Sequence, residues 1–267
     1  MKIMSYNINC FKGKKGPLTN MSENIHKISS FIKGFLVADI DNLVILQEVP
    51  YKNFEIYHNA KKIDENKFVF FYSDIIGKPN FITIGIANKD SNWKKTLKNN
   101  KFGFYYFKTV NNSNVDYLNR FVEVYNRKYD LIVLGLHMPC NKSENESIVS
   151  FWSELSSYKN KIKNPFIIVG DLNAELNENS TFGKELNTLG GKDLINAGTF
   201  PTSNGVNSID HMLVYNCENL INYSHTGEVL NFIDYSDHYP IISPPIKKLP
   251  IENWKNYIDF FYECDTI

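Results

Sequence analysis

Residues 166–175 read FIIVGDLNAE, an apolar run followed by Gly170, Asp171, Leu172 and Asn173. A short apolar run that ends in such a turn is typical of a buried strand. A carboxylate directly after this run lies at the edge of a packed core, where losing water is costly unless a cation or hydrogen-bond donors compensate. The segment therefore predicts a core strand with a chemically demanding group at its end.

Similar apolar or alternating runs recur along the chain and predict a β-rich core. They cover residues 3–8, 43–46, 68–72, 81–87, 102–110, 121–125, 131–136, 166–169, 209–214 and 239–242. Helical spacing of apolar residues predicts helices over 25–36, 148–155 and 182–189. Many strands with few helices suggest two sheets packed face to face and covered by helices.

The composition fits a single globular domain over residues 1–267, with an extra C-terminal helix at about 250–264. No stretch approaches 18 apolar residues, so we expect no membrane insertion. The first residues lack the apolar region of a signal peptide, and the four cysteines form no CxxC pair. We therefore expect a cytoplasmic protein with reduced thiols. The sequence leaves the oligomeric state open.

The charges balance, with 29 basic and 29 acidic residues, and predict no strong general attraction to nucleic acid. Basic residues are concentrated in the first 150 positions, where 21 Lys and Arg face 14 Asp and Glu. Lys12, Lys14 and Lys15 follow the first strand, and Arg120 precedes another, so these four are candidate substrate contacts. A solvated loop, or an ion pair for Arg120, is the plainer interpretation.

Polar residues stand at the ends of several predicted strands, where a sheet does not need them. They are Asn7, Glu48, His137, Asp171 with Asn173, Asp210, and Asp237 with His238. Several carboxylates in one cleft would repel each other without a compensating cation. Oxygen ligands without cysteine suit Mg²⁺ or Mn²⁺ rather than zinc.

In this order the polar residues form motifs, and the set resembles the endonuclease/exonuclease/phosphatase superfamily. The motifs are Asn7, QE at 47–48, His137, GDLN at 170–173, IDH at 209–211 and SDH at 236–238. Each is weak alone, but six in order at strand ends are a strong signal. The resemblance implies a four-layer α/β sandwich, in which two mainly antiparallel β-sheets pack face to face and are flanked by helices. It also implies cleavage of phosphate esters with a divalent metal.

The resemblance further implies roles for the oxygen-bearing residues. Glu48 would be the main metal ligand, with Asn7 and Asp237 beside it. Asp171 would orient and deprotonate the attacking water. Asn173 would hydrogen-bond the phosphate or that water.

The same resemblance assigns the histidines. His238 would bind the scissile phosphate oxygen, with Asp210 as the carboxylate that orients it. His137 would be the second histidine, and it would supply a further donor if cationic. His211 follows Asp210, but strand alternation directs it to the opposite face, so we interpret it as structural.

The substrate is less clearly indicated. The chain has QEVP where abasic-site endonucleases usually carry a lysine after QE, and residues 66–80 lack the glutamate that pairs with a histidine in deoxyribonuclease-type enzymes. We expect a nuclease acting on DNA or RNA. The alternatives are a phosphatase or phosphodiesterase for small phosphorylated molecules or phospholipid headgroups, and a catalytically silent binding module.

Overall fold

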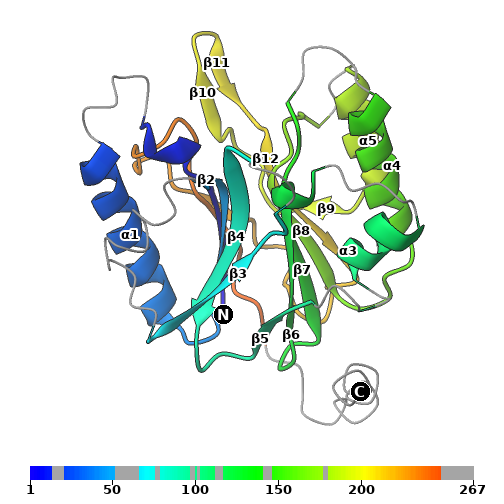
Figure 1. Cartoon of the computed structure of the whole chain (residues 1–267), viewed down its shortest axis with the longest axis horizontal. Coiled ribbons are helices and arrows are strands. Elements are labelled where there is room, and N and C mark those ends of the chain that lie inside the picture. The colour runs from blue at the N-terminus through cyan, green and yellow to red at the C-terminus, as the bar shows by residue number, and fades with distance from the viewer. Residues whose placement is uncertain are drawn as a thin grey trace.

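The computed structural model describes residues 1–13, 21–51, 66–75, 79–96, 100, 103–111, 117–140, 146–176 and 180–247. These residues form four layers, with two sheets back to back between helices (Figure 1). This is the four-layer α/β sandwich that the sequence predicted. The expected helix at about 250–264 lies outside the described residues.

The first sheet has six strands in the order β13-β14-β1-β2-β4-β3. They are β1 (Ile3–Asn7), β2 (Leu43–Pro50), β3 (Phe68–Tyr72), β4 (Phe81–Asn88), β13 (Glu228–Val229) and β14 (Ile241–Ile242). Only β1 and β2 pair in parallel, and every other pair in this sheet is antiparallel.

The second sheet also has six strands, in the order β5-β6-β7-β8-β12-β9. They are β5 (Trp93–Lys95), β6 (Phe121–Asn126), β7 (Leu131–His137), β8 (Phe166–Asp171), β9 (Lys192–Asp193) and β12 (Asp210–Tyr215). Here β7 and β8 are the parallel pair. A separate hairpin of β10 (Phe200–Thr202) and β11 (Gly205–Asn207) projects beyond one end of the sheets (Figure 1).

The helices form the two outer layers. α1 (Met21–Ala38) covers the first sheet, while α3 (Phe104–Tyr106), α4 (Glu146–Lys159) and α5 (Thr181–Leu189) lie on the side of the second (Figure 1). Shorter turns are η1 (Asn9–Phe11), η3 (Phe107–Asn111) and η4 (Leu118–Arg120). Among the described residues, none of the helices is long and apolar enough to cross a membrane.

Three apolar clusters fill the three spaces between the four layers. In β2, Ile45 faces the other sheet, whereas Val44 and Leu46 face α1. In β8, Ile167 faces the first sheet, whereas Ile168 faces α4. Because both faces of each central strand are covered, the strands contain runs of consecutive apolar residues, such as 43–46 in β2 and 166–169 in β8, rather than a strict alternation.

One predicted strand is wrong. The run at 102–110 was expected to be extended because aromatic residues favour strands, but the described part forms α3 followed by the π-helical turn η3. Phe104 and Phe107, three residues apart, both pack into the cluster under α4. Lys108 is also buried, paired with Glu154 of α4 at 2.5 Å. Tertiary packing thus overrides the strand preference of the segment.

Candidate active site between the two sheets

Three neighbouring strands of the second sheet bring His137, Asp171 and Asp210 to one edge. β7 and β8 run parallel, and their register sets His137 beside Asp171. β12 runs antiparallel to β8 and begins at Asp210, directly across from Asp171. All three residues are buried. Adjacent strand ends thus gather residues that are far apart in the sequence.

The first sheet contributes Asn7 and Glu48. β1 ends at Asn7, which pairs with Gln47 of β2. The register between β2 and β4 shifts between Leu46 and Val49, and Glu48 within this bulge has a φ of 53°. A bulge re-aims a side chain, and Oε1 of Glu48 lies 3.3 Å from Nδ2 of Asn7.

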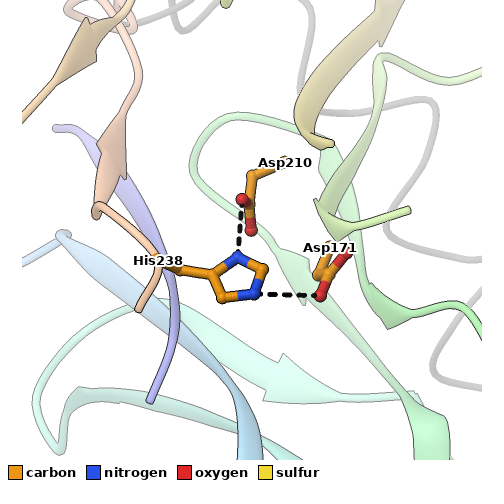
Figure 2. A group of neighbouring side chains, drawn as sticks. All are labelled: Asp171, Asp210 and His238. Carbon is orange, nitrogen blue, oxygen red and sulfur yellow. Dashed lines mark hydrogen bonds and ion pairs between the residues drawn. The ribbon is translucent and has the colours of Figure 1, made fainter. Parts of the chain in front are cut away.

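The loop between β13 and β14 carries Ser236 and His238 to the same place. Ser236 Oγ donates to the backbone oxygen of Asn7 at 2.8 Å, which ties the loop to the end of β1. His238 Nδ1 lies 2.8 Å from Asp210 Oδ2, and its Nε2 lies 3.7 Å from Asp171 Oδ2 (Figure 2). The two sheets and this loop therefore meet in one buried group.

His238 is held as a cation. Burial disfavours the charged imidazole, but the charge and hydrogen bond of Asp210, together with Asp171, raise the pKa of His238 to about 10. A cationic imidazole donates from both nitrogens. Nδ1 therefore donates to Asp210, and the second donor, Nε2–H, is directed toward Asp171.

In Asp171 a raised pKa favours the neutral form of the side chain instead. Burial raises the pKa of Asp171 to about 7, even though His238 favours its charged form. Its Oδ2 accepts a hydrogen bond from Asn7 Nδ2 at 2.9 Å, and its Oδ1 accepts one from the backbone nitrogen of Asn173 at 2.9 Å. A carboxyl group with a pKa near neutrality is well matched to accepting a proton from water.

Arg120 is the neighbour that orients His137. Its Nη1 lies 3.4 Å from Nδ1 of His137, and its guanidinium lies over the ring of Phe81. Because arginine only donates, Nδ1 is the accepting nitrogen. Nε2–H then points toward Glu48 and Asp171, at 3.7 and 3.8 Å.

The same surroundings set the charge of His137. Burial, followed by the charges of Arg120 and His238, holds the pKa of His137 well below its ordinary value. His137 is therefore a neutral donor, and the cationic form considered from the sequence is not the one that these neighbours favour. The side chain at Nδ1 of His137 is thus the cation of Arg120 and not a carboxylate.

Asn173 lies at the site but is already engaged. Its Nδ2 donates to the backbone oxygen of Met138 at 2.7 Å, and its φ is 51°. Its side chain thus braces the strand end that carries His137. The expected contact of Asn173 with phosphate or water stays a prediction.

Glu48 has the surroundings of a cation ligand. Its side chain is 25% exposed, and no lysine or arginine of the described residues forms a salt bridge with it. Its Oε2 lies 4.0 Å from the thiol of Cys10, and burial, followed by the charges of Glu48 and Asp237, raises the pKa of that thiol to about 11. Asn7 Oδ1 accepts from Asn9 N at 3.0 Å and keeps a second lone pair. This oxygen-rich, negatively charged set fits Mg²⁺ or Mn²⁺.

The donor atoms of Asp171, Asp210 and His238 also lie within 4.8 Å of one another, a spacing that would admit an ion. However, Asp210 and His238 already satisfy each other through the 2.8 Å hydrogen bond. Because that hydrogen bond occupies Nδ1 of His238 and Oδ2 of Asp210, Glu48 and Asn7 offer the more accessible oxygen atoms to a cation.

Left-handed backbone is concentrated at this site. Non-glycine residues with positive φ include Asn9, Cys10, Phe11, Glu48 and Asn173. Such conformations cost free energy and are often found at functional sites. Lys12 follows this turn and is exposed, whereas Lys14 and Lys15 lie outside the described residues.

Two phenylalanines, Phe81 and Phe200, flank the histidines. The ring centroid of Phe81 lies 5.1 Å from that of His137, and the centroid of Phe200 lies 4.7 Å from that of His238. Thr199, next to Phe200, accepts a hydrogen bond from the backbone of Asp210 at 3.1 Å. Nothing in the sequence distinguishes these phenylalanines from core residues.

The comparison with protein families decides the classification. The model described as the Endonuclease/Exonuclease/phosphatase family matches residues 4–238. The chain belongs to this family. Its members are in general hydrolases of phosphoester bonds that use divalent metals, and the six motifs lie within the matched range.

Solved structures of the endonuclease/exonuclease/phosphatase family share the fold. An AP endonuclease from Archaeoglobus fulgidus superposes with a TM-score of 0.61 at 12% identity, covering 91% of this chain and 98% of that chain. TDP2 from D. rerio, complexed with a single-strand DNA product, gives 0.56 at 16% identity, covering 91% and 97%. The endonuclease domain of TRAS1, a telomere-specific non-LTR retrotransposon, gives 0.57 at 16% identity, covering 90% and 95%. No curated protein matches by sequence comparison.

Proposed function

We propose that this protein is a Mg²⁺- or Mn²⁺-dependent phosphodiesterase that hydrolyses the backbone of a nucleic acid. One observation supports the proposal. Asp171, whose carboxyl pKa is raised to about 7, has its Oδ2 3.7 Å from Nε2 of His238, and the carboxylate of Glu48 on the adjacent sheet lies 3.3 Å from Nδ2 of Asn7. Phosphodiester hydrolysis needs a base for water and positive groups around the phosphate.

The roles follow from the hydrogen bonds. Asp171 takes the proton of the attacking water at Oδ2, which Asn7 holds in place at 2.9 Å. His238 donates from Nε2 to a non-bridging phosphate oxygen, while Asp210 keeps its ring oriented and charged. His137 donates from Nε2 to the same phosphate without adding charge. Glu48, Asn7 and Asp237 would hold the divalent cation, which neutralises phosphate charge when bound.

A polymeric substrate is favoured by what surrounds the site. Lys12 follows the strand end that carries Asn7, and lysine is suited to backbone phosphates. The hairpin β10–β11, whose second strand is exposed, begins at Phe200 against His238 and extends beyond the sheets (Figure 1). Two of the structural neighbours carry endonuclease in their descriptions and a third holds a DNA product. A cytoplasmic location stays a prediction.

To test this, the purified full chain is incubated in Mg²⁺ or Mn²⁺ with three substrates, and hydrolysis is measured. The substrates are supercoiled plasmid, a structured RNA and a small diester, bis(p-nitrophenyl) phosphate. Asp171→Asn is the inactive variant and should lose at least about 100-fold in rate. Asp130→Asn is its matched control, because Asp130 is a strand-end carboxylate that accepts from Tyr125 and Asn164 at the start of β7, away from the site.

The proposal is supported if the parent protein and Asp130→Asn cleave the polymers, while EDTA and Asp171→Asn each abolish cleavage. Turnover of small esters alone, including inositol phosphates, would replace it with a phosphatase. No turnover of any substrate would leave a binding module on this fold.

A further inference from the structure

His211 is buried beneath the active site and makes two short polar contacts. Its Nδ1 lies 2.6 Å from Oδ2 of Asp193 in β9, and its Nε2 lies 2.8 Å from the backbone oxygen of Ala174. Strand alternation directs His211 to the face of β12 opposite Asp210. It therefore does not line the site, but its Nε2 contacts the chain segment that leaves the site.

Both contacts require His211 to donate. A backbone carbonyl only accepts, so Nε2 carries a proton, and the Asp193 carboxylate calls for a second proton on Nδ1. The other oxygen of Asp193 accepts from the backbone nitrogens of Ile195 and Met212, at 3.0 and 3.1 Å. Burial opposes a charge on His211, but the hydrogen bond and charge of Asp193 raise its pKa.

The segment that His211 holds is the turn after β8. The backbone nitrogen of Leu172 donates to Ile209 at 2.9 Å, and the side chain of Asn173 donates to Met138 at 2.7 Å. Asn173 is left-handed, and its backbone nitrogen donates to Asp171. After Asn173, the carbonyl of Ala174 is bound by His211. The turn is thus fixed on both sides of a strained residue.

We propose that His211 is a positioning residue for the active site, and that its Nε2–H, by holding the Ala174 carbonyl, fixes the turn that aims Asp171 and Asn173. The inference rests on the proposed function for its catalytic readout. It assigns the hydrogen bond to Ala174, rather than the ion pair with Asp193, as the part that matters for catalysis.

Two double variants separate these contributions. In Asp193→Asn, a neutral His211 still donates from Nε2 while Nδ1 accepts from the new amide. On this background, His211→Gln supplies an amide donor for Ala174, whereas His211→Phe supplies none. Residue 193 is an uncharged asparagine in both double variants, so neither leaves a buried unpaired charge. The two double variants therefore differ mainly in whether residue 211 can donate a hydrogen bond.

We expect the His211→Phe double variant to lose about 10- to 100-fold in kcat with KM within about threefold, since small displacements of a catalytic group have effects of this size. Asp193→Asn and the His211→Gln double variant should keep kcat within about threefold of the parent. Glu154→Gln, which disrupts the buried pair with Lys108 under α4, should lower stability without changing kcat.

Amide hydrogen exchange at Leu172 and Asn173 provides a second readout that needs no substrate. Exchange at both should be faster in the His211→Phe double variant than in the His211→Gln one. Equal kcat and equal exchange in the two doubles would overturn the inference. If the parent protein hydrolyses nothing, the proposed function fails, while the exchange comparison still decides whether His211 fixes the turn.

Discussion

At the scale of single residues, the site combines a carboxyl group and an imidazole whose pKa values are both raised. Burial raises the pKa of Asp171 to about 7. Burial would lower the pKa of His238, but the charge and hydrogen bond of Asp210 have a larger effect and raise it to about 10. The base form of Asp171 and the acid form of His238 therefore coexist at pH 7 to 10. A bound divalent cation favours the carboxylate and moves the lower limit down.

The pH dependence of kcat/KM follows from these two groups. We expect activity in Mg²⁺ to rise through an acidic limb at or below pH 7, as Asp171 ionises, and to persist until His238 loses its proton near pH 10. Initial rates between pH 5 and 10 would measure both limits. A decline between pH 7 and 8 would contradict the cationic His238.

The raised pKa of Asp171 also has a consequence for stability without metal. The folded state keeps the proton on Asp171 above pH 3.8, where the unfolded state has lost it, so unfolding becomes easier as the pH rises from about 4 through 7. In EDTA, Asp171→Asn should lack this loss and be more stable than the parent at pH 8. Urea unfolding at pH 5 and 8 measures the difference, and equal slopes with pH for the two proteins would contradict the expectation.

At the scale of elements, the parallel pair β7–β8 depends on one glycine. Gly170 has a φ of +147°, and a Cβ there would overlap the backbone oxygen of Leu136. We expect Gly170→Ala to lower the free energy of unfolding by at least about 3 kcal/mol. Gly34→Ala is the matched control, since Gly34 lies in α1 with open space around it and should gain about 1 kcal/mol. Similar effects of the two changes in urea unfolding would contradict this account.

The hairpin β10–β11 contains no charged residue between Phe200 and Asn207, so it suits neutral contacts with a nucleic acid rather than phosphates. Val206 is 53% exposed on it. A negative charge there should repel a polyanion, and we expect Val206→Glu to raise KM for an oligonucleotide about fivefold while leaving turnover of a small diester unchanged.

Val37→Glu controls for the charge, because Val37 is 62% exposed near the end of α1. This end of α1 leads to the start of β2, the opposite end of that strand from Glu48. Its KM should stay at the parental value. An equal rise for Val37→Glu and Val206→Glu would show a general charge effect and no contact by the hairpin.

At the scale of the whole molecule, the site lies where the two sheets meet, so a bound cation should stabilise the folded arrangement of the two sheets. Ligand at 100 times its Kd adds about 2.7 kcal/mol, or roughly 5–11 °C in Tm for a domain of this size. We expect Mg²⁺ to raise Tm of the parent and of Asp130→Asn, but not of Glu48→Gln. Thermal unfolding with Mg²⁺ and with EDTA measures this, and an unchanged shift in Glu48→Gln would exclude Glu48 as the main ligand.

The sequence predicted most elements because their signals are local. Apolar runs and helical spacing are set by neighbouring residues, and the strand Phe68–Tyr72 was placed with its observed bounds. The prediction of a strand at 102–110 was wrong because the residues that Phe104 and Lys108 contact, Tyr158 and Glu154, lie some fifty residues further along the chain, in α4. Contacts of that range leave no periodic pattern in the segment itself.

The sequence by itself determined that strands with two covered faces end in carboxylates, amides and imidazoles, since those residue types and their order are written in it. Only the tertiary structure decided which atoms meet. The contact between Arg120 and His137 and the hydrogen bond from His211 to the Ala174 carbonyl depend on strand register and on the path of the loops. The distance between the two halves of the site depends on how closely the sheets pack, and Gly135 permits this approach because a Cβ there would overlap Ile45. Such fits arise from packing in three dimensions, which neighbouring residues along the chain do not encode.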